Sequence, residues 1–324
     1  MLTPPSEIGE GALRAGLESG WGMRVEALDH LPLGAGSHHW AASGAGGGEW
    51  FVTLDDVRTK PWLGDEVALA TRRLDAALSV AVSLRDRPGI DVVAPVLARD
   101  GRPTHVIEEG WALSVTPRIS GTAGPFAITW PSVGRASMLD RLAVLHGSRT
   151  PDGLHRITLL PERIGLRAVL DDLAGPWVGG PGAEPARLWL GAHADAVHDR
   201  LEELETLETS LVDRPLVVTH GEPHPGNVLV DGDRMWLVDW DTAGLAPPER
   251  DLWWFRDGDL SAWSSRTGMR VDRRGLAAYA LAWTLADVAS YVGELRRPHA
   301  DTADSRAAYD RLAAVDLGER GLTR

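Results

Sequence analysis

The sequence predicts an α+β protein with a small, strand-rich N-terminal part and a larger, mainly helical C-terminal part. Residues 33–54 combine a glycine-bearing turn with a short aromatic and β-branched run, which is typical of neighbouring strands. Beyond residues 117–125, apolar side chains recur mostly at helical spacing. Residues 214–255 interrupt this helical part, and within them residues 228–238 have the pattern of a β-hairpin.

The composition is that of an ordinary globular protein. The 324 residues suffice for two domains or for one domain with a large insertion, and 44% apolar with 24% charged residues is a soluble profile. The absence of cysteine excludes disulfides and thiolate metal sites. The first residues lack a secretory pattern, and the apolar stretch 276–292 contains Asp287 and is short for a bilayer span. We therefore expect a cytoplasmic protein without a membrane partner.

The net charge of −13 bears on the partners. Nucleic-acid binding depends largely on basic side chains that neutralise phosphates, so an acidic chain disfavours it. The field of an acidic protein favours a cationic small molecule instead, although the charge can also serve solubility alone. The oligomeric state is open at this level.

The N-terminal elements follow from turn residues and periodicity. A glycine turn at 33–37 precedes a strand at 50–54, and the two suggest a hairpin. A helix is predicted over 65–87, because its apolar residues lie on one side and Pro88-Gly89 ends it. Residues 92–96 and 111–115 are predicted as two further strands.

The composition changes at residues 117–125, which hold two prolines and two glycines. We place a boundary there, with an N-terminal lobe at 1–116 and a C-terminal lobe at 117–324. The clearest later helix has apolar residues at helical spacing between Leu281 and Leu295. The helices predicted in this part span 137–146, 188–211 and 276–295.

Polar residues flank the predicted hairpin at 228–238 in a way that a core does not require. Glu222 and Asn227 lie in the loop before it, and Asp239 and Asp241 follow it. Because a hairpin returns the chain to its starting edge, Glu222, Asn227 and Asp239 are expected at one end of the two strands. Carboxylate and amide oxygens suit Mg²⁺, and phosphoryl transfer requires that metal and a carboxylate beside the attacking hydroxyl.

A zinc site is the competing interpretation of this loop. His220 and His224 are four residues apart with an acidic residue between them. The helical zinc motif needs both histidines on one helix face, and Gly221, Pro223 and Pro225 argue against a helix here. No Gly-x-Ser-x-Gly elbow of a serine hydrolase occurs in the sequence.

The pattern of His220-Gly221-Glu222, then Asn227, then a hairpin and Asp239 resembles the catalytic core of aminoglycoside phosphotransferases and choline-kinase-like enzymes. Residues 238–252 look most like the spectinomycin phosphotransferase branch. The resemblance implies a bilobed protein-kinase-like fold. It also implies ATP or GTP as co-substrate, Mg²⁺, and a small polar acceptor such as an aminoglycoside or aminocyclitol.

The resemblance also implies roles for individual residues. Glu222 matches the catalytic base, and Asn227 and Asp239 match the metal-binding residues of the active site. Asp241 and Asp287 are candidates for binding a cationic substrate, although Asp241 can also bind metal or cap a turn and Asp287 can belong to a solvated helix face. His220 and Asp251 match residues that steady the loop. The nucleotide phosphates would be covered by Gly34, Gly36 and Ser37 and contacted by Lys60.

Two departures from the family pattern favour an alternative. Glu222 stands where the family usually has aspartate, and Thr53 stands at the apparent position of the strand lysine. Lys60, the only lysine, is predicted in a loop, and Glu66 matches the usual partner of that lysine only loosely. The alternative is a nucleotide-binding pseudokinase that does not transfer phosphate. A resistance role and a biosynthetic role are not distinguished at this level.

Overall fold

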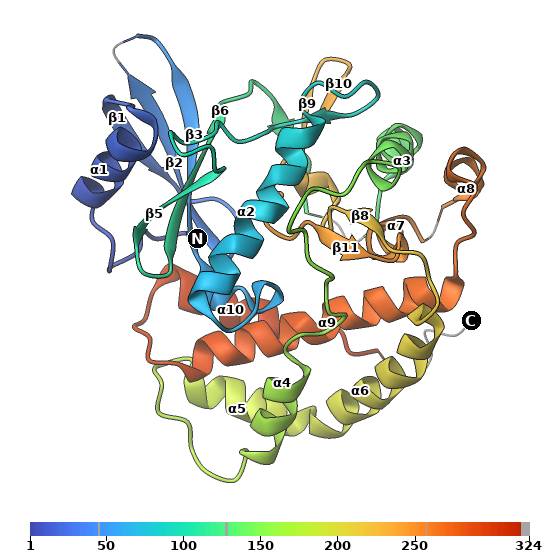
Figure 1. Cartoon of the computed structure of the whole chain (residues 1–324). Helices are drawn as coiled ribbons and strands as arrows, with labels where there is room; N and C mark the ends of the chain where they lie inside the picture. Colours follow the sequence, from blue (N-terminus) through green and yellow to red (C-terminus); the bar gives the residue numbers. More distant parts are fainter. Residues whose placement is uncertain (45, 127–128, 257, 319–324) are drawn as a thin grey trace. The chain divides into compact units, whose positions relative to one another are not determined.

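The computed structural model describes all residues except 45, 127–128, 257 and 319–324 (Figure 1). The chain forms two compact units, one made of Met1–Ile157 and Pro215–Val271 and the other of Thr158–Arg214 and Asp272–Arg324. All the strands of the described residues belong to the first unit. The predicted boundary near residue 116 lies at the end of a strand in the first unit, and the division into two lobes stays a prediction.

A five-stranded antiparallel sheet occupies the N-terminal part of the first unit, in the order β1-β2-β3-β6-β5. Successive side chains of each strand point to opposite faces of the sheet, so that Val52 and Leu54 are buried on one face of β3 while Thr53 and Asp55 lie on the other. The helix α1 (Glu10–Trp21) packs against β1, β5 and β6 and closes the core on its side. The strands are β1 (Val25–Leu31), β2 (Ser37–Gly44), β3 (Glu49–Asp56), β5 (Thr104–Glu108) and β6 (Trp111–Pro117).

A short connection of two 3₁₀ turns leads from β3 to the helix α2 (Val67–Leu84). The turns are η1 (Val57–Thr59) and η2 (Pro61–Leu63), and Lys60 lies between them. The Asp56 side chain accepts a hydrogen bond from the Arg58 N–H and caps the first turn. This cap and the proline at the start of η2 fix the path of the backbone on both sides of Lys60.

The rest of the first unit contains two small sheets and short helices. One sheet has the order β4-β10-β9-β7, in which β9 and β10 form a hairpin, and the other pairs β8 with β11. Gly232 has a φ of 58° in the hairpin turn, a conformation that favours glycine. The strands are β4 (Asp91–Val92), β7 (Thr122–Ala123), β8 (Val217–Thr219), β9 (Val228–Asp231), β10 (Arg234–Leu237) and β11 (Gly244–Ala246); the helices and turns are α3 (Ser132–His146), η4 (Pro225–Asn227), α7 (Glu249–Leu252), η5 (Trp253–Phe255) and α8 (Ser261–Thr267).

The described part of the second unit consists of helices packed around α9 (Arg273–Arg296). By length and composition α9 is the one helix among the described residues that could cross a membrane, and half of its most apolar window is buried, as in the core helix of a globular protein. With 24 residues it is longer than the apolar stretch suggested by the sequence. The other helices and turns are α4 (Arg163–Asp171), α5 (Ala183–Ala192), α6 (Ala194–Glu208), η3 (Thr209–Leu211) and α10 (Ala303–Ala313).

Several predicted elements differ from those observed. The strand predicted over 92–96 is only the two-residue β4, which pairs with β10 rather than with the N-terminal sheet. The helix predicted over 188–211 is two helices, α5 and α6, separated at His193. The glycine turn, β3, α2, β6, the β9–β10 hairpin and α9 are confirmed.

Candidate active site

The β9–β10 hairpin brings the three predicted site residues together. Val228 pairs with Leu237, and the next backbone bond runs from the Val238 N–H to the Asn227 carbonyl at 3.1 Å. The Asn227 side chain donates from Nδ2 to the Glu222 carbonyl at 3.1 Å. Asn227 therefore links the loop of Glu222 to the strand end that precedes Asp239, and its amide oxygen is not used in that bond.

Asp239 has a backbone conformation that points to a functional constraint. Its φ is 66°, the single positive φ of a non-glycine residue in the described part of the chain. Loss of water, followed by the negative charges of Asp241 and Glu222, raises the pKa of Asp239 well above its usual value. Because Asp239 is an exposed residue, the charges of the neighbouring carboxylates account for the raised pKa.

The loop before the hairpin is anchored by the buried carboxylate of Asp251. It accepts hydrogen bonds from the N–H groups of His220 at 2.9 Å and Gly221 at 2.6 Å, and a third bond joins it to His146 Nε2 at 3.0 Å. Burial by itself would raise the pKa of Asp251. The hydrogen bond from His146 and the nearby positive charges outweigh burial, so the pKa is lowered. Trp263 donates to His146 Nδ1, so His146 carries its proton on Nε2 and donates to Asp251.

His220 holds the loop against the hairpin. Its Nε2 lies 2.9 Å from the Val238 carbonyl and therefore donates, while its Nδ1 accepts from the Glu222 N–H at 3.3 Å. Burial lowers the pKa of His220, which agrees with a neutral ring. Both ring nitrogens are thus engaged within the protein. The ring is built into the loop and does not present a free nitrogen to a zinc ion.

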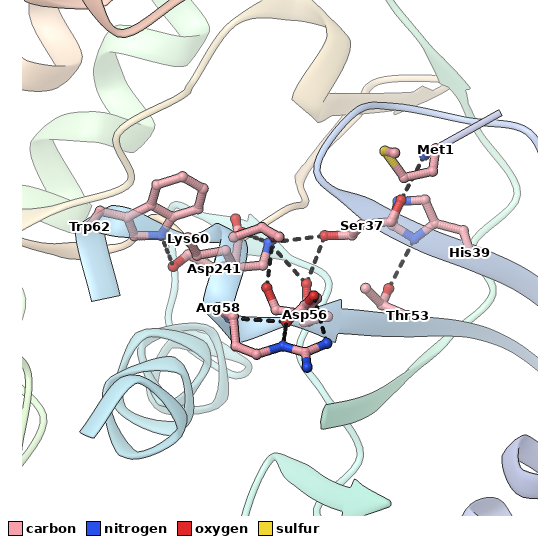
Figure 2. A network of polar contacts seen from close by, with 11 residues as sticks. Met1, Ser37, His39, Thr53, Asp56, Arg58, Lys60, Trp62 and Asp241 are labelled. Atoms are coloured by element: carbon pink, nitrogen blue, oxygen red, sulfur yellow. Dashed lines mark hydrogen bonds and ion pairs between the residues drawn. The ribbon is translucent and has the colours of Figure 1, made fainter. Parts of the chain in front are cut away.

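Lys60 lies at the centre of a buried polar network (Figure 2). Its Nζ is 2.6 Å from an Asp241 carboxylate oxygen, 3.0 Å from an Asp55 carboxylate oxygen and 3.0 Å from the Ser37 hydroxyl. Burial alone would lower the pKa of Lys60, but the charges of Asp241 and Asp55 outweigh it and the pKa is raised. Trp62 donates to the Asp241 carbonyl at 3.2 Å, so residues 60–62 contact Asp241 twice.

The glycine turn leads directly into this network. Gly34 and Gly36 have φ angles of 66° and 84°, which glycine adopts without strain. Ser37 begins β2, is buried, and donates from its hydroxyl to Asp55 at 2.7 Å. The structure thus brings the turn, Ser37 and Lys60 into one region of the first unit. Their role in phosphate binding stays a prediction.

The two acidic residues predicted to bind substrate have different surroundings. Asp241 is buried, and although burial opposes it, the Lys60 ammonium lowers the pKa of Asp241. Asp287 lies on α9 in the second unit, where burial raises its pKa to about 6 despite a hydrogen bond with Tyr291. Substrate binding by either residue stays a prediction.

Residues that sequence reasoning missed include Asp55 and Trp62, which contact Lys60 or its partner. The signal for Asp55 was present, because an acidic side chain two positions after Thr53 shares its face of the strand. His224 was considered only as a zinc ligand. It is a buried ring whose Nδ1 has no hydrogen-bond partner among the residues that the structure describes, and whose Nε2 lies 3.9 Å from the Glu222 carboxylate.

The site fits a hard divalent cation. The carboxyl groups of Asp241 and Glu222 lie close enough to Asp239 to raise its pKa, and the Lys60 ammonium is the opposing charge beside Asp241. The surplus negative charge and the Asn227 amide oxygen form a suitable donor set for Mg²⁺. The described residues contain no group of three or more His, Cys, Asp or Glu side chains that could hold a metal ion.

A loop carboxylate, an amide and a second carboxylate lie around one hairpin, as the resemblance to phosphotransferases predicts. Residues 136–291 match the model of the phosphotransferase enzyme family. The matched residues include the site loop and the hairpin. The chain therefore carries a phosphotransferase domain of this family, as the resemblance predicted.

Known proteins resemble the chain over most of its length. Protein StrN of Streptomyces griseus is 28% identical over 254 residues, which cover 71% of this chain and 73% of StrN. Among solved structures, spectinomycin phosphotransferase APH(9)-Ia in complex with ADP and spectinomycin has a TM-score of 0.70 at 18% identity and covers 94% of each chain. Amicoumacin kinase hAmiN in complex with AMP-PNP has a TM-score of 0.63 at 13% identity, over 95% of this chain and 92% of that one. These structural matches confirm the predicted α+β, protein-kinase-like fold.

Proposed function

We propose that the protein transfers the γ-phosphoryl group of ATP or GTP to a hydroxyl of a small polar molecule, with an aminoglycoside or aminocyclitol as the leading acceptor class. The observation that carries this proposal is the convergence of Glu222, Asn227 and Asp239 around the β9–β10 hairpin. Phosphoryl transfer needs little covalent chemistry from the protein, so positioned oxygen ligands and one carboxylate are the parts that matter.

Each of the three residues has a separate task in this proposal. The Asn227 amide oxygen and the Asp239 carboxylate would hold Mg²⁺, which neutralises charge on the transferred group when it is bound. Glu222 orients the acceptor hydroxyl and accepts its proton as the new oxygen–phosphorus bond forms and the bond to the leaving nucleoside diphosphate breaks. Asp251 and His220 do not touch substrate in this scheme; they hold the loop that presents Glu222.

The nucleotide phosphates are assigned to the region of Gly34, Gly36, Ser37 and Lys60. Backbone N–H groups of a glycine turn can approach phosphate closely, and Lys60 supplies a buried ammonium at the same place. That APH(9)-Ia was solved with ADP and hAmiN with AMP-PNP supports a nucleotide co-substrate for this fold.

The acceptor is proposed to be cationic. The net charge of −13 favours attraction of ammonium groups, and Asp241 and Asp287 are the candidates for binding them. Spectinomycin in the APH(9)-Ia complex and hygromycin B in an APH(4)-Ia complex support this class. Modification of an antibiotic in the cytoplasm, for resistance or during biosynthesis, is the role that we propose.

A nucleotide-binding pseudokinase is the second candidate, because Thr53 and Glu222 depart from the family pattern. Thermal stabilisation by MgATP and MgGTP in the wild type and in Asp239→Ala tests metal-dependent binding common to both candidates. Consumption of nucleotide with a panel of aminoglycosides and aminocyclitols then separates them. Turnover supports the enzyme, and metal-dependent stabilisation without turnover on the panel supports the pseudokinase. Equal melting temperatures with and without nucleotide would reject both.

A further inference from the structure

The face of β3 that should carry the family's lysine carries Thr53 and Asp55 instead. Alternate residues of a strand share a face, so the two side chains lie about 7 Å apart on the same side of the sheet. Each faces a residue of β2 in the antiparallel register, Thr53 opposite His39 and Asp55 opposite Ser37. The Thr53 hydroxyl forms a hydrogen bond with His39 Nδ1 at 3.2 Å.

Lys60 brings an ammonium group to this face from outside the strand. The polypeptide leaves β3 and forms the turn η1 immediately before Lys60. Figure 2 shows the contact of the Lys60 side chain with Ser37 on β2. The Nζ atom ends 3.0 Å from Asp55 and 3.0 Å from the Ser37 hydroxyl, with the residue only 2% exposed. The Lys60 ammonium thus lies beside Asp55, which is two residues from Thr53 on the same face of β3. Thr53 is the position at which the resemblance places the family's lysine.

Asp55 has the properties of a fixed partner for this ammonium. It lies on β3, the middle strand of the five-stranded sheet, is 2% exposed, accepts a hydrogen bond from Ser37 and forms an ion pair with Lys60. Glu66, which the sequence suggested as the partner, is instead an exposed residue at the start of α2. Asp241 also contacts Lys60, but it follows the metal-binding Asp239 in the proposed site and belongs to the other side of the network.

We propose that Asp55, supported by Ser37, is the positioning residue that holds Lys60 at the nucleotide phosphates, so that a loop lysine and a strand aspartate replace the usual pair of strand lysine and helix glutamate. The inference rests on the proposed nucleotide-dependent function and deepens it. A buried ammonium with a carboxylate on a rigid strand keeps both its charge and its location, which a lysine on an unanchored loop would not. Thr53 then has no need to be lysine.

The test compares a ligand that has phosphates with one that lacks them. Asp55→Asn keeps the shape of the side chain and an oxygen that accepts from Ser37, but removes the charge that holds Lys60. We expect the affinity for MgADP, measured by calorimetry, to fall at least about tenfold while the affinity for adenosine is unchanged. GDP and guanosine replace this pair of ligands if the wild type prefers guanine. Glu66→Gln is the matched control and should alter neither affinity.

The outcomes separate this inference from the proposed function. Loss of both affinities in equal proportion, or of neither, overturns the positioning role of Asp55. If the wild type itself binds no Mg-nucleotide, the proposed function fails first. Should Asp55→Asn fail to fold, the double variant Asp55→Asn/Lys60→Gln removes both charges of the pair together, so that no buried ammonium is left without its partner at position 55. It must show the same selective loss of MgADP affinity, and retention of wild-type MgADP affinity would overturn the inference.

Discussion

Glu222 is one methylene longer than the aspartate expected at its position, yet its surroundings hold it within the site. Its backbone N–H donates to His220, its carbonyl accepts from Asn227, and its charge acts on Asp239. The loop is therefore fixed on both sides of the longer side chain. A base built this way can keep its geometry although the carboxylate reaches further from the backbone.

Glu222→Gln should lower turnover strongly and leave nucleotide binding intact. Glutamine keeps the size of the side chain but cannot accept the proton, and general-base catalysis is worth about 10²–10⁴-fold. We expect kcat to fall by that order while the MgATP dissociation constant stays within about twofold. The exposed Glu109→Gln is the control for an unspecific effect of losing a carboxylate. Full activity in Glu222→Gln would remove this residue from the mechanism.

Asp287 is a half-buried acidic group on α9. Burial raises its pKa to about 6 against a hydrogen bond with Tyr291, a favourable charge from Arg311 and a hydrogen bond with Trp283. The folded state therefore binds a proton more tightly than the unfolded state does. The contribution of the protonated Asp287 to the free energy of unfolding is fully present below about pH 4, and it is lost as the pH rises through about 6. A cationic acceptor bound at Asp287 would offset the loss, which is why the residue is a credible substrate contact.

Asp287→Asn should accordingly make the protein more stable at pH 7, by about 1–3 kcal/mol in the free energy of unfolding. The same substitution should flatten the decline in stability between about pH 4 and pH 6. Urea unfolding at a series of pH values measures both effects, with the exposed Asp213→Asn as control. A variant that is less stable than the wild type at pH 7 would show that the Asp287 hydrogen bonds outweigh the desolvation of its charge.

At the scale of elements, the loop from β8 to the hairpin depends on one glycine. Gly221 has a φ of 101°, its N–H donates to Asp251, and a Cβ there would lie 2.4 Å from the Arg250 guanidinium. Arg250 is itself bonded to Thr219 and to the Thr242 carbonyl, so it cannot move without losing those contacts. The loop thus tolerates no side chain at this position without a change in its anchors.

Gly221→Ala should reduce the free energy of unfolding by about 2–4 kcal/mol and lower activity by more than stability alone explains. The matched change is Gly293→Ala within α9, where a Cβ meets nothing within 4 Å. That variant should gain about 0.5–1 kcal/mol, because alanine is the better helix former. The two Gly→Ala variants should change the free energy of unfolding in opposite directions. Such a result would identify the left-handed backbone of Gly221 and its contact with Arg250 as the cause of the loss.

The elements that could be predicted are those whose signals are local. The hairpin was predictable because a glycine turn lies between two strand-like runs, and it located Glu222, Asn227 and Asp239 without further information. The helix α1 was not predicted, since its glycines weaken the helical signal. Packing explains two of them: a Cβ on Gly16 would lie 2.4 Å from Ile107, and a Cβ on Gly20 would lie 2.9 Å from His105 on the sheet.

The polar network of Lys60 was the least predictable part of the site. Lys60 and Asp241 are 181 positions apart, and no local pattern reports such a contact. The sequence showed that the strand lacked a lysine and that Lys60 was the only one available, but not where its ammonium would lie. Only the tertiary structure assigns Asp55 and Asp241 as its partners.

At the scale of the whole molecule, the net charge of −13 should act in opposite directions on the two substrates. A negative field raises the encounter rate of a cationic acceptor and lowers that of an anionic nucleotide, and salt screens both effects. We expect kcat/KM for a polycationic acceptor to fall several-fold between about 0.05 and 0.5 M salt, where the screening length shortens from above 10 Å to below 5 Å. Over the same range the KM for MgATP should stay level or decrease.

The control for this prediction is an acceptor of similar size without ammonium groups. Its kcat/KM should vary little with salt, because no long-range attraction is being screened. Equal salt dependence for charged and uncharged acceptors would indicate that salt acts on the protein rather than on the encounter. In that case the acidic surface would serve solubility only, and the selectivity for cationic acceptors would have to come from contacts such as those proposed for Asp241 and Asp287.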